Sequence, residues 1–426
     1  MIKFLKSHPI LFIAFVGLIL RISFYLFNSE IIIRNDSATY LELAQLIASG
    51  SIVGYFGGRA PGYPLILALL GNSTVKLVIF QSLIGIISSI LWYKILRHFK
   101  FAIPISIFVS LFFSSFLQVL AYENTMLIET INLFFITLLV FYIVKSKVLY
   151  AAFCLTFLVL LKPFYIYLPF IILLYFGYTS YNWKSFLKTK MILLILPLIA
   201  FFSWSYVNFL NTGYFVSSTY FGLNKIQNCV NFIEKAPVEY NWIKEPYLKQ
   251  RKLHNVNGLG NPMCIWYAVD NGDFDYKKMS FPQLSNEFGK CADATIKNNF
   301  GLYIKQVVFL SFKEFWNVES VRPNSIEKNV FLNYLWKIEA LFLRILKTIF
   351  LFLIPVYGFK FLKNKLFTVE LVLILLVLAT GILQALVAYG SNARYSFPLE
   401  FIMITIVLLF IKNNFFASKN ETALIK

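Results

Sequence analysis

Ten predominantly apolar stretches of 14 to 24 residues constrain the fold of this chain more than any other feature. They cover residues 9–27, 74–96, 101–122, 126–144, 148–161, 163–177, 191–210, 338–361, 366–387 and 395–411. A helix needs about 20 apolar residues to cross the hydrocarbon core of a bilayer. We therefore predict an all-α polytopic membrane protein with about ten transmembrane helices. The chain has 59% hydrophobic and 14% charged residues, and this composition excludes a soluble multidomain enzyme.

The first apolar stretch, residues 9–27, follows Lys3 and Lys6 and so has the charge pattern of a signal peptide. It is about 19 residues long, and no small-residue cleavage site follows it. We therefore predict a spanning helix.

Basic residues concentrate in every second connection between the predicted helices. Residues 97–100, 145–147, 178–190 and 360–365 together contain ten Lys and Arg and no Asp or Glu. Cytoplasmic loops carry such an excess. This predicts cytoplasmic N- and C-termini in a bacterial inner membrane. The formal net charge of +19 then indicates orientation in the membrane, and no nucleic-acid partner is expected.

Under this topology the chain has three parts. Residues 1–210 form an N-terminal transmembrane module of about seven helices, whose first outer loop spans residues 28–73. Residues 211–337 form a small, mainly helical periplasmic domain with 15 basic and 11 acidic residues, and residues 338–426 supply about three more helices. The apolar stretch 63–71 is too short to span, so we expect a juxtamembrane helix there.

The cysteines do not indicate a disulfide scaffold. Cys154 lies within a predicted helix, and Cys229, Cys264 and Cys291 fall in the outer domain. Three thiols allow at most one disulfide, and the sequence does not choose the pair.

Charged residues at the predicted outer face form the candidate site. Asp36 and Glu129 are carboxylates at helix starts, while Arg59, Lys162 and Arg394 are cations at turns or helix junctions. Such groups at membrane depth normally face a cavity or a charged partner. Taken singly, the carboxylates are also typical of helix caps, and the cations of interface anchors. Taken together, they predict an anion site, and an arginine beside an interfacial turn suits a phosphate.

Short motifs follow one another in a definite order along the chain. They are Asp36 with Tyr40 and Ala44; Arg59-x-Pro61-Gly62-Tyr63-Pro64; Glu129; Lys162-Pro163; Pro197, Trp204 and Asn208; Gly213-Tyr214-Phe215, Ser218-Thr219 and Gly222-Leu223-Asn224; and Arg394-Tyr395-Ser396-Phe397-Pro398. This order, with the topology, resembles the GT-C type glycosyltransferases, especially the protein mannosyltransferase and lipid A aminoarabinose transferase group (glycosyltransferase family 39).

The resemblance implies a GT-C fold and transfer of a sugar from a polyprenyl-phosphate donor to an acceptor hydroxyl at the outer face, with inversion. It implies that Asp36 is the catalytic base. It places Arg59, Lys162 and Arg394 at the donor phosphate. It also implies that Tyr40, Tyr63 and Glu129 orient the sugar or these cations.

The chain departs from the family pattern in places, such as Lys162-Pro163 where the family usually has Arg-Pro, and the resemblance leaves the acceptor open. Many family members have a second acid after the aspartate, where this chain has Ser37, so a metal pair is not indicated. We expect no cofactor to be required. The acceptor is an unidentified glycan, lipid or protein.

Two other functions are compatible with the sequence. A lipid-linked glycan polymerase or ligase would depend on outer-loop arginines rather than on Asp36. A lipid flippase or secondary transporter often contains internal repeats and midplane charges. This chain shows no internal repeat, and its charges gather at one face.

Overall fold

The computed structural model describes residues 7–28, 31–179, 189–255, 258–318, 322–390 and 392–416. Within these ranges the chain is built from helices, and its one β-type pairing is an isolated parallel bridge between Ile32 and Thr125. The predicted all-α class is confirmed.

Six helical segments of the described chain are long and apolar enough to cross a membrane. They are α2 (Pro9–Phe27), α5 (Thr74–His98), α12 (Ile192–Thr212), α20 (Val330–Asn364), α21 (Val369–Val387) and the continuous segment Asn392–Phe415, which contains α22 (Asn392–Ser396), η6 (Phe397–Leu399) and α23 (Glu400–Phe415). Their mean hydropathy ranges from 1.8 to 2.4. The chain is thus a helical protein with the segments expected of a membrane protein.

The remaining apolar stretches are helical but bent or short. Helices α6 (Ile103–Ser114) and α7 (Leu117–Glu123) meet at an angle of 62° and could form a seventh span. Helices α8 (Glu129–Val144) and α9 (Val148–Leu161), and the segment Pro163–Tyr178 that joins η1 (Pro163–Tyr167) to α10 (Leu168–Tyr178), have only 10 to 17 residues. The described residues therefore contain six or seven helices that could span a membrane, and the predicted number of ten is not confirmed.

Helix α20 begins earlier than predicted. It starts at Val330 rather than near residue 338, because the side chain of Asn329 accepts a hydrogen bond from the backbone N–H of Leu332 and caps it. The helix is 35 residues long, so at 1.5 Å per residue it exceeds the thickness of a hydrocarbon core.

The connections also contain helices. The first outer loop holds α3 (Asn35–Ala48) and α4 (Gly62–Leu69), and the eight residues of α4 are too few to span. The region after α12 is built from α13 (Phe221–Gln227), η2 (Ile233–Lys235), η3 (Val238–Tyr240), α14 (Asn241–Leu253), α15 (Cys264–Asp270), η4 (Asp275–Lys277), α16 (Phe281–Asn298), α17 (Phe300–Gln306), η5 (Val307–Ser311), α18 (Phe312–Phe315) and α19 (Asn324–Lys328).

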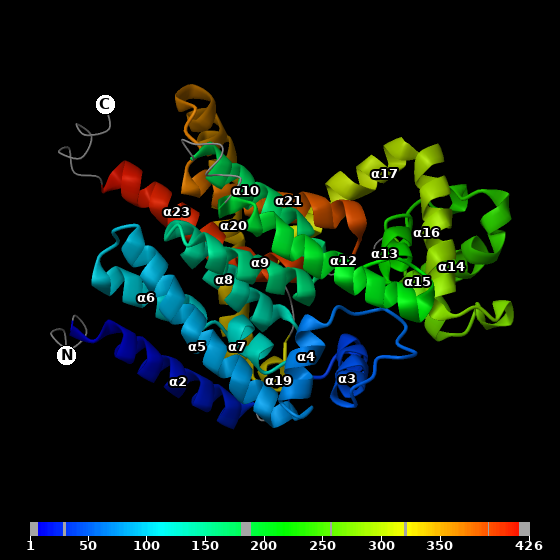
Figure 1. Cartoon of the computed structure of the whole chain (residues 1–426), viewed down its shortest axis with the longest axis horizontal. Helices are drawn as coiled ribbons and strands as arrows, with labels where there is room; N and C mark the ends of the chain where they lie inside the picture. The colour runs from blue at the N-terminus through cyan, green and yellow to red at the C-terminus, as the bar shows by residue number, and fades with distance from the viewer. Residues whose placement is uncertain are drawn as a thin grey trace.

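Figure 1 shows how these parts are arranged. Helices α13 to α16 gather at one end of the molecule, and α12 leads toward them from the bundle. The start of α2 and the end of α23 lie at the opposite end. This arrangement agrees with a topology in which the two chain ends share one side.

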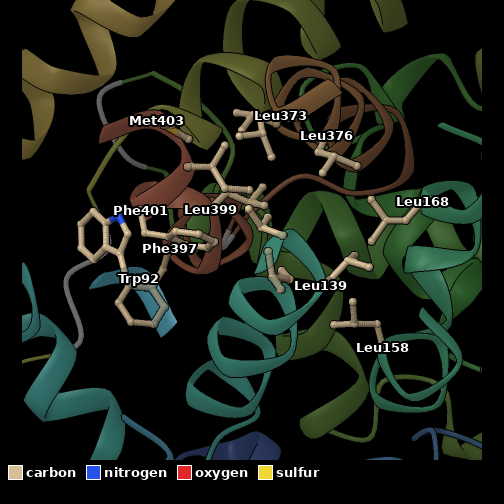
Figure 2. Packing of buried hydrophobic residues seen from close by; sticks show 14 of the residues in the cluster. Trp92, Leu139, Leu158, Leu168, Leu373, Leu376, Phe397, Leu399, Phe401 and Met403 are labelled. Atoms are coloured by element: carbon tan, nitrogen blue, oxygen red, sulfur yellow. The ribbon is translucent and has the colours of Figure 1, made fainter. Parts of the chain in front are cut away.

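The two largest clusters of buried hydrophobic residues are separate from each other. In the bundle, Trp92 of α5 donates a hydrogen bond to Thr405 of α23 at 3.0 Å and packs against Phe401 (Figure 2). The second cluster lies within residues 223–292 and includes Cys229, Cys264 and Cys291, which are buried free thiols. No disulfide is therefore formed among the four cysteines, all of which the structure describes.

Two ion pairs are buried among the bundle helices. Arg21 of α2 makes two hydrogen bonds to Glu123 of α7, at 2.9 and 2.7 Å, and both side chains are no more than 5% exposed. Lys347 of α20 lies 2.8 Å from Glu400 of α23. Because an unpaired ion in such a place is strongly destabilising, each pair ties two helices together.

The Arg21–Glu123 pair generates a testable prediction. Glu123→Gln leaves the Arg21 charge buried without a counter-ion, so the free energy of unfolding in detergent should fall by about 3–5 kcal/mol. The double variant Arg21→Met, Glu123→Leu removes both charges and should be markedly more stable than Glu123→Gln. Equal stability of the single and double variants would contradict this role.

Candidate functional site

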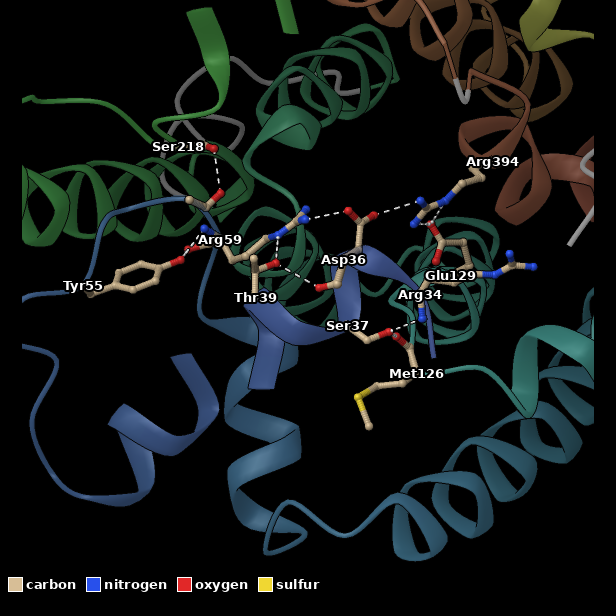
Figure 3. A network of polar contacts seen from close by, with 11 residues as sticks. Arg34, Asp36, Ser37, Thr39, Tyr55, Arg59, Met126, Glu129, Ser218 and Arg394 are labelled. Carbon is tan, nitrogen blue, oxygen red and sulfur yellow. Dashed lines mark hydrogen bonds and ion pairs between the residues drawn. The ribbon is translucent and has the colours of Figure 1, made fainter. Parts of the chain in front are cut away.

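Four charged side chains form a continuous chain of ion pairs at the outer-loop end of the bundle (Figure 3). The Arg59 guanidinium donates to Oδ1 of Asp36 at 2.7 Å, and Arg394 donates to Oδ2 of Asp36 at 2.9 Å. Arg394 also donates from two nitrogens to Oε1 of Glu129, at 3.0 and 2.8 Å. The structure therefore brings together four predicted site residues: Asp36 from α3, Glu129 from α8, Arg394 from α22, and Arg59 from the turn before α4.

Burial is least at Asp36, which lies between the two arginines, and is greatest at Glu129. The Glu129 side chain is 0% exposed, the two arginines are 18–19% exposed, and Asp36 is 33% exposed. Asp36 is thus the charged group that an incoming molecule can reach most easily.

Backbone pairing positions Asp36 opposite Glu129. The N–H of Ile32 donates to the carbonyl of Asn124, and the N–H of Met126 donates to the carbonyl of Ile32. The Ser37 hydroxyl then donates to the carbonyl of Met126 at 2.8 Å. These bonds fasten the start of α3 to the segment that begins α8.

Helix α3 begins at Asn35, with Arg34 as its N-cap, so Asp36 lies in the first turn. Its carboxylate oxygens bind the two arginines, and the capping interaction is made by Ser37, which accepts a hydrogen bond from the N–H of Arg34. Asp36 is therefore not explained as a helix cap.

The turn that carries Arg59 is held by the outer domain. The Thr219 N–H donates to the carbonyl of Gly57, and the Ser218 hydroxyl donates to the carbonyl of Gly58. Gly57 has a φ of +79°, and a Cβ there would lie 2.8 Å from the Thr219 side chain. Glycine is required at this contact because its backbone must adopt a left-handed conformation at close range.

The same turn packs against the end of α9. A Cβ on Gly62 would lie 2.8 Å from the backbone of Leu160 and Leu161. This close approach brings the turn beside Lys162, which directly follows α9.

The side chain of Arg59 is held by Thr39, Tyr40 and Tyr220, of which only Tyr40 was predicted to orient the sugar or a cation. Arg59 Nε donates to the hydroxyl of Thr39 at 2.8 Å, and the guanidinium lies 4.7 and 4.9 Å from the ring centroids of Tyr40 and Tyr220. Such cation–π contacts fix the plane of an arginine. The spacing of Thr39 three residues after Asp36 on one helix was a local signal, whereas nothing in the sequence linked Tyr220 to Arg59.

Tyr40 contacts the Arg59 guanidinium directly, whereas Tyr63 contacts Tyr40. Tyr40 stacks beneath Arg59, as a residue that orients a cation would. Tyr63 is 0% exposed and makes an edge contact with the Tyr40 ring at 5.0 Å. It therefore supports Tyr40 from behind and does not reach the ion pairs.

Lys162 is the third cation of this site. Its Nζ lies 3.6 Å from the ring centroid of Tyr395, and no carboxylate among the described residues forms an ion pair with it. Burial lowers the pKa of its ammonium from 10.5 to about 8, although Glu129 opposes this effect. The charge balance is then three cations against two carboxylates.

Electrostatics keep Asp36 ionised. Its partial burial alone would raise the carboxyl pKa, but the charges of Arg59 and Arg394 outweigh burial, so the pKa lies well below its usual range. A carboxylate in this state is a weak base for as long as both arginines remain bound to it.

Glu123 does not belong to this site. It pairs with Arg21 inside the bundle rather than with the cations of this site. Among the described residues, no group of three or more His, Cys, Asp or Glu side chains is placed to hold a metal ion.

No family model, curated protein or solved structure matches this chain.

The low pKa of Asp36 predicts how stability depends on pH. Because the folded-state pKa is below the unfolded value near 4, the stabilisation by the arginines is complete above that value and is lost as pH falls through the folded pKa. The difference in unfolding free energy between wild type and Asp36→Asn, about 1–3 kcal/mol, should stay constant from pH 8 to 5.

Glu42 provides the control because it is an exposed carboxylate on the same helix. Glu42→Gln should leave thermal or denaturant unfolding in detergent unchanged. A difference between wild type and Asp36→Asn that disappears between pH 7 and 5 would contradict the low pKa.

Proposed function

We propose that this chain is a membrane glycosyltransferase that moves a sugar from a polyprenyl-phosphate donor to an acceptor hydroxyl at the outer face of the cytoplasmic membrane. One observation carries the proposal: a reachable carboxylate, Asp36, lies between two arginines, with Lys162 as a further cation. Cations can stabilise a phosphate leaving group, and a carboxylate can accept the proton of the acceptor hydroxyl.

The reaction follows from these groups. The acceptor oxygen forms a bond to the anomeric carbon, and its proton passes to Asp36. The bond from the anomeric carbon to the phosphate oxygen breaks, and its electron pair stays on the polyprenyl phosphate. Attack opposite the leaving group inverts the anomeric configuration. The cations stabilise the charge that develops on the phosphate.

The residues divide between these tasks. Arg59, Arg394 and Lys162 would bind the phosphate, and Glu129 would hold Arg394 in place through its two hydrogen bonds. The apolar helices beside the site would accommodate the polyprenyl chain. The basic inner loops support an orientation with this site on the outer face.

A transfer assay tests the proposal. Purified protein in liposomes is supplied with a polyprenyl phosphate carrying a radiolabelled hexose or pentose, together with envelope extract as acceptor. Asp36→Asn should lower turnover at least 100-fold, because proton transfer by a positioned base contributes about that much. Arg59→Ala and Lys162→Ala should weaken donor use at unchanged protein abundance.

Three outcomes would contradict the proposal. Near-normal turnover of Asp36→Asn removes this residue as the base, and indifference to loss of all three cations removes the phosphate site. Movement of the labelled lipid across the bilayer without sugar transfer would identify a flippase instead.

The ammonium of Lys162 predicts an alkaline limit for donor use. Because its pKa is about 8, wild-type donor use should decline as pH rises through this value. Arginine keeps its charge throughout this range, so Lys162→Arg should shift the decline to higher pH. The KM for the donor, measured from pH 7 to 9.5, checks this, and an identical profile for both proteins would contradict it.

A further inference from the structure

Each oxygen of the Asp36 carboxylate already accepts a hydrogen bond from an arginine. Oδ1 accepts from Arg59 at 2.7 Å and Oδ2 accepts from Arg394 at 2.9 Å. Hydrogen bonds to a charged partner are stronger than those between neutral groups. A neutral acceptor hydroxyl gains far less from Asp36 than two guanidinium groups do, so it is a poor competitor for this carboxylate.

An anionic phosphate, in contrast, competes for the arginines themselves. It offers them the same bidentate geometry as a carboxylate and carries full charge. Lys162 has no carboxylate partner among the described residues and so remains available to attract this anion to the site.

Each arginine keeps its own anchor when it leaves Asp36. Arg394 retains two hydrogen bonds to Glu129, and Arg59 retains the Thr39 hydroxyl and its stacking on the aromatic ring of Tyr40. The guanidinium groups can therefore exchange one carboxylate contact for a phosphate contact while they stay at the site. Asp36 has no comparable second partner and is the group that becomes free.

We propose that Asp36 is a gate: the donor phosphate takes Arg59 and Arg394 from it, and only then is its carboxylate free to receive the acceptor hydroxyl. The donor therefore binds before the acceptor. This inference rests on the proposed function, since it concerns the order of events at that same site. It also reconciles the low basicity of Asp36 at rest with its role as a base, because loss of the two cations restores its basicity.

The gate predicts that removal of the Asp36 charge improves phosphate binding, since this carboxylate competes with the ligand. The probe is farnesyl phosphate, a short polyprenyl phosphate, titrated into the full chain in nanodiscs. Asp36→Asn should lower its Kd about tenfold or more. Farnesol, which has the same tail without the charge, should bind both proteins equally.

Matched variants separate this effect from general electrostatics. Glu42→Gln removes the same charge from an exposed position on α3 and should leave the Kd unchanged. Asp36→Ser gives a second route to the same loss of charge, and a melting curve shows that each variant is folded. A Kd for farnesyl phosphate in Asp36→Asn and Asp36→Ser equal to or weaker than that of wild type would overturn the gate.

The gate and the enzyme proposal fail in different ways. If wild-type protein does not prefer farnesyl phosphate over farnesol, the phosphate site and the proposed function are both wrong. If wild type shows this preference but neutralisation of Asp36 leaves it unchanged, the phosphate site stands and the gate is wrong.

Discussion

The alternation of charge from Arg59 through Asp36 and Arg394 to Glu129 is the interaction on which the arrangement of the end of the bundle beside α3 depends. Glu129 is wholly buried and would be costly there without Arg394. Arg394 also forms an ion pair with Asp36, and Asp36 forms another with Arg59. Each member thus compensates the burial of its neighbour, and the helices that carry them must meet in one relative placement.

Much of this site could be predicted from the sequence because charge is rare in an apolar chain. Asp36, Arg59, Glu129 and Arg394 stood out against long stretches of Phe, Ile and Leu, and their positions at helix starts or turns placed them at one level. The sequence could not predict which of these residues form ion pairs with one another. Asp36 and Arg394 are 358 residues apart, and a hydropathy pattern reports depth in the membrane without lateral neighbours.

The fold, too, could be predicted from the sequence only in part. Apolar length located the helices, because hydrophobic thickness sets how many residues a span needs. The early start of α20 depends on a local cap. Packing against other helices, which the sequence does not show, bears on the 62° bend between α6 and α7 and on the short lengths of α8 and α9. The role of Tyr220, which lies beyond the membrane helices yet stacks on Arg59, is likewise a tertiary result.

The two pairs buried among the helices have a consequence for biosynthesis. Arg21 emerges from the ribosome 102 residues before Glu123, and Lys347 precedes Glu400 by 53 residues. A lone cation in hydrocarbon is unfavourable, so α2 and α20 should be held at the insertion machinery or at the lipid headgroups until their counter-ions arrive. The later helices would then supply the counter-ions that the earlier helices need for stable insertion. A chain truncated before Glu123 would lack the counter-ion of Arg21 in its first helix.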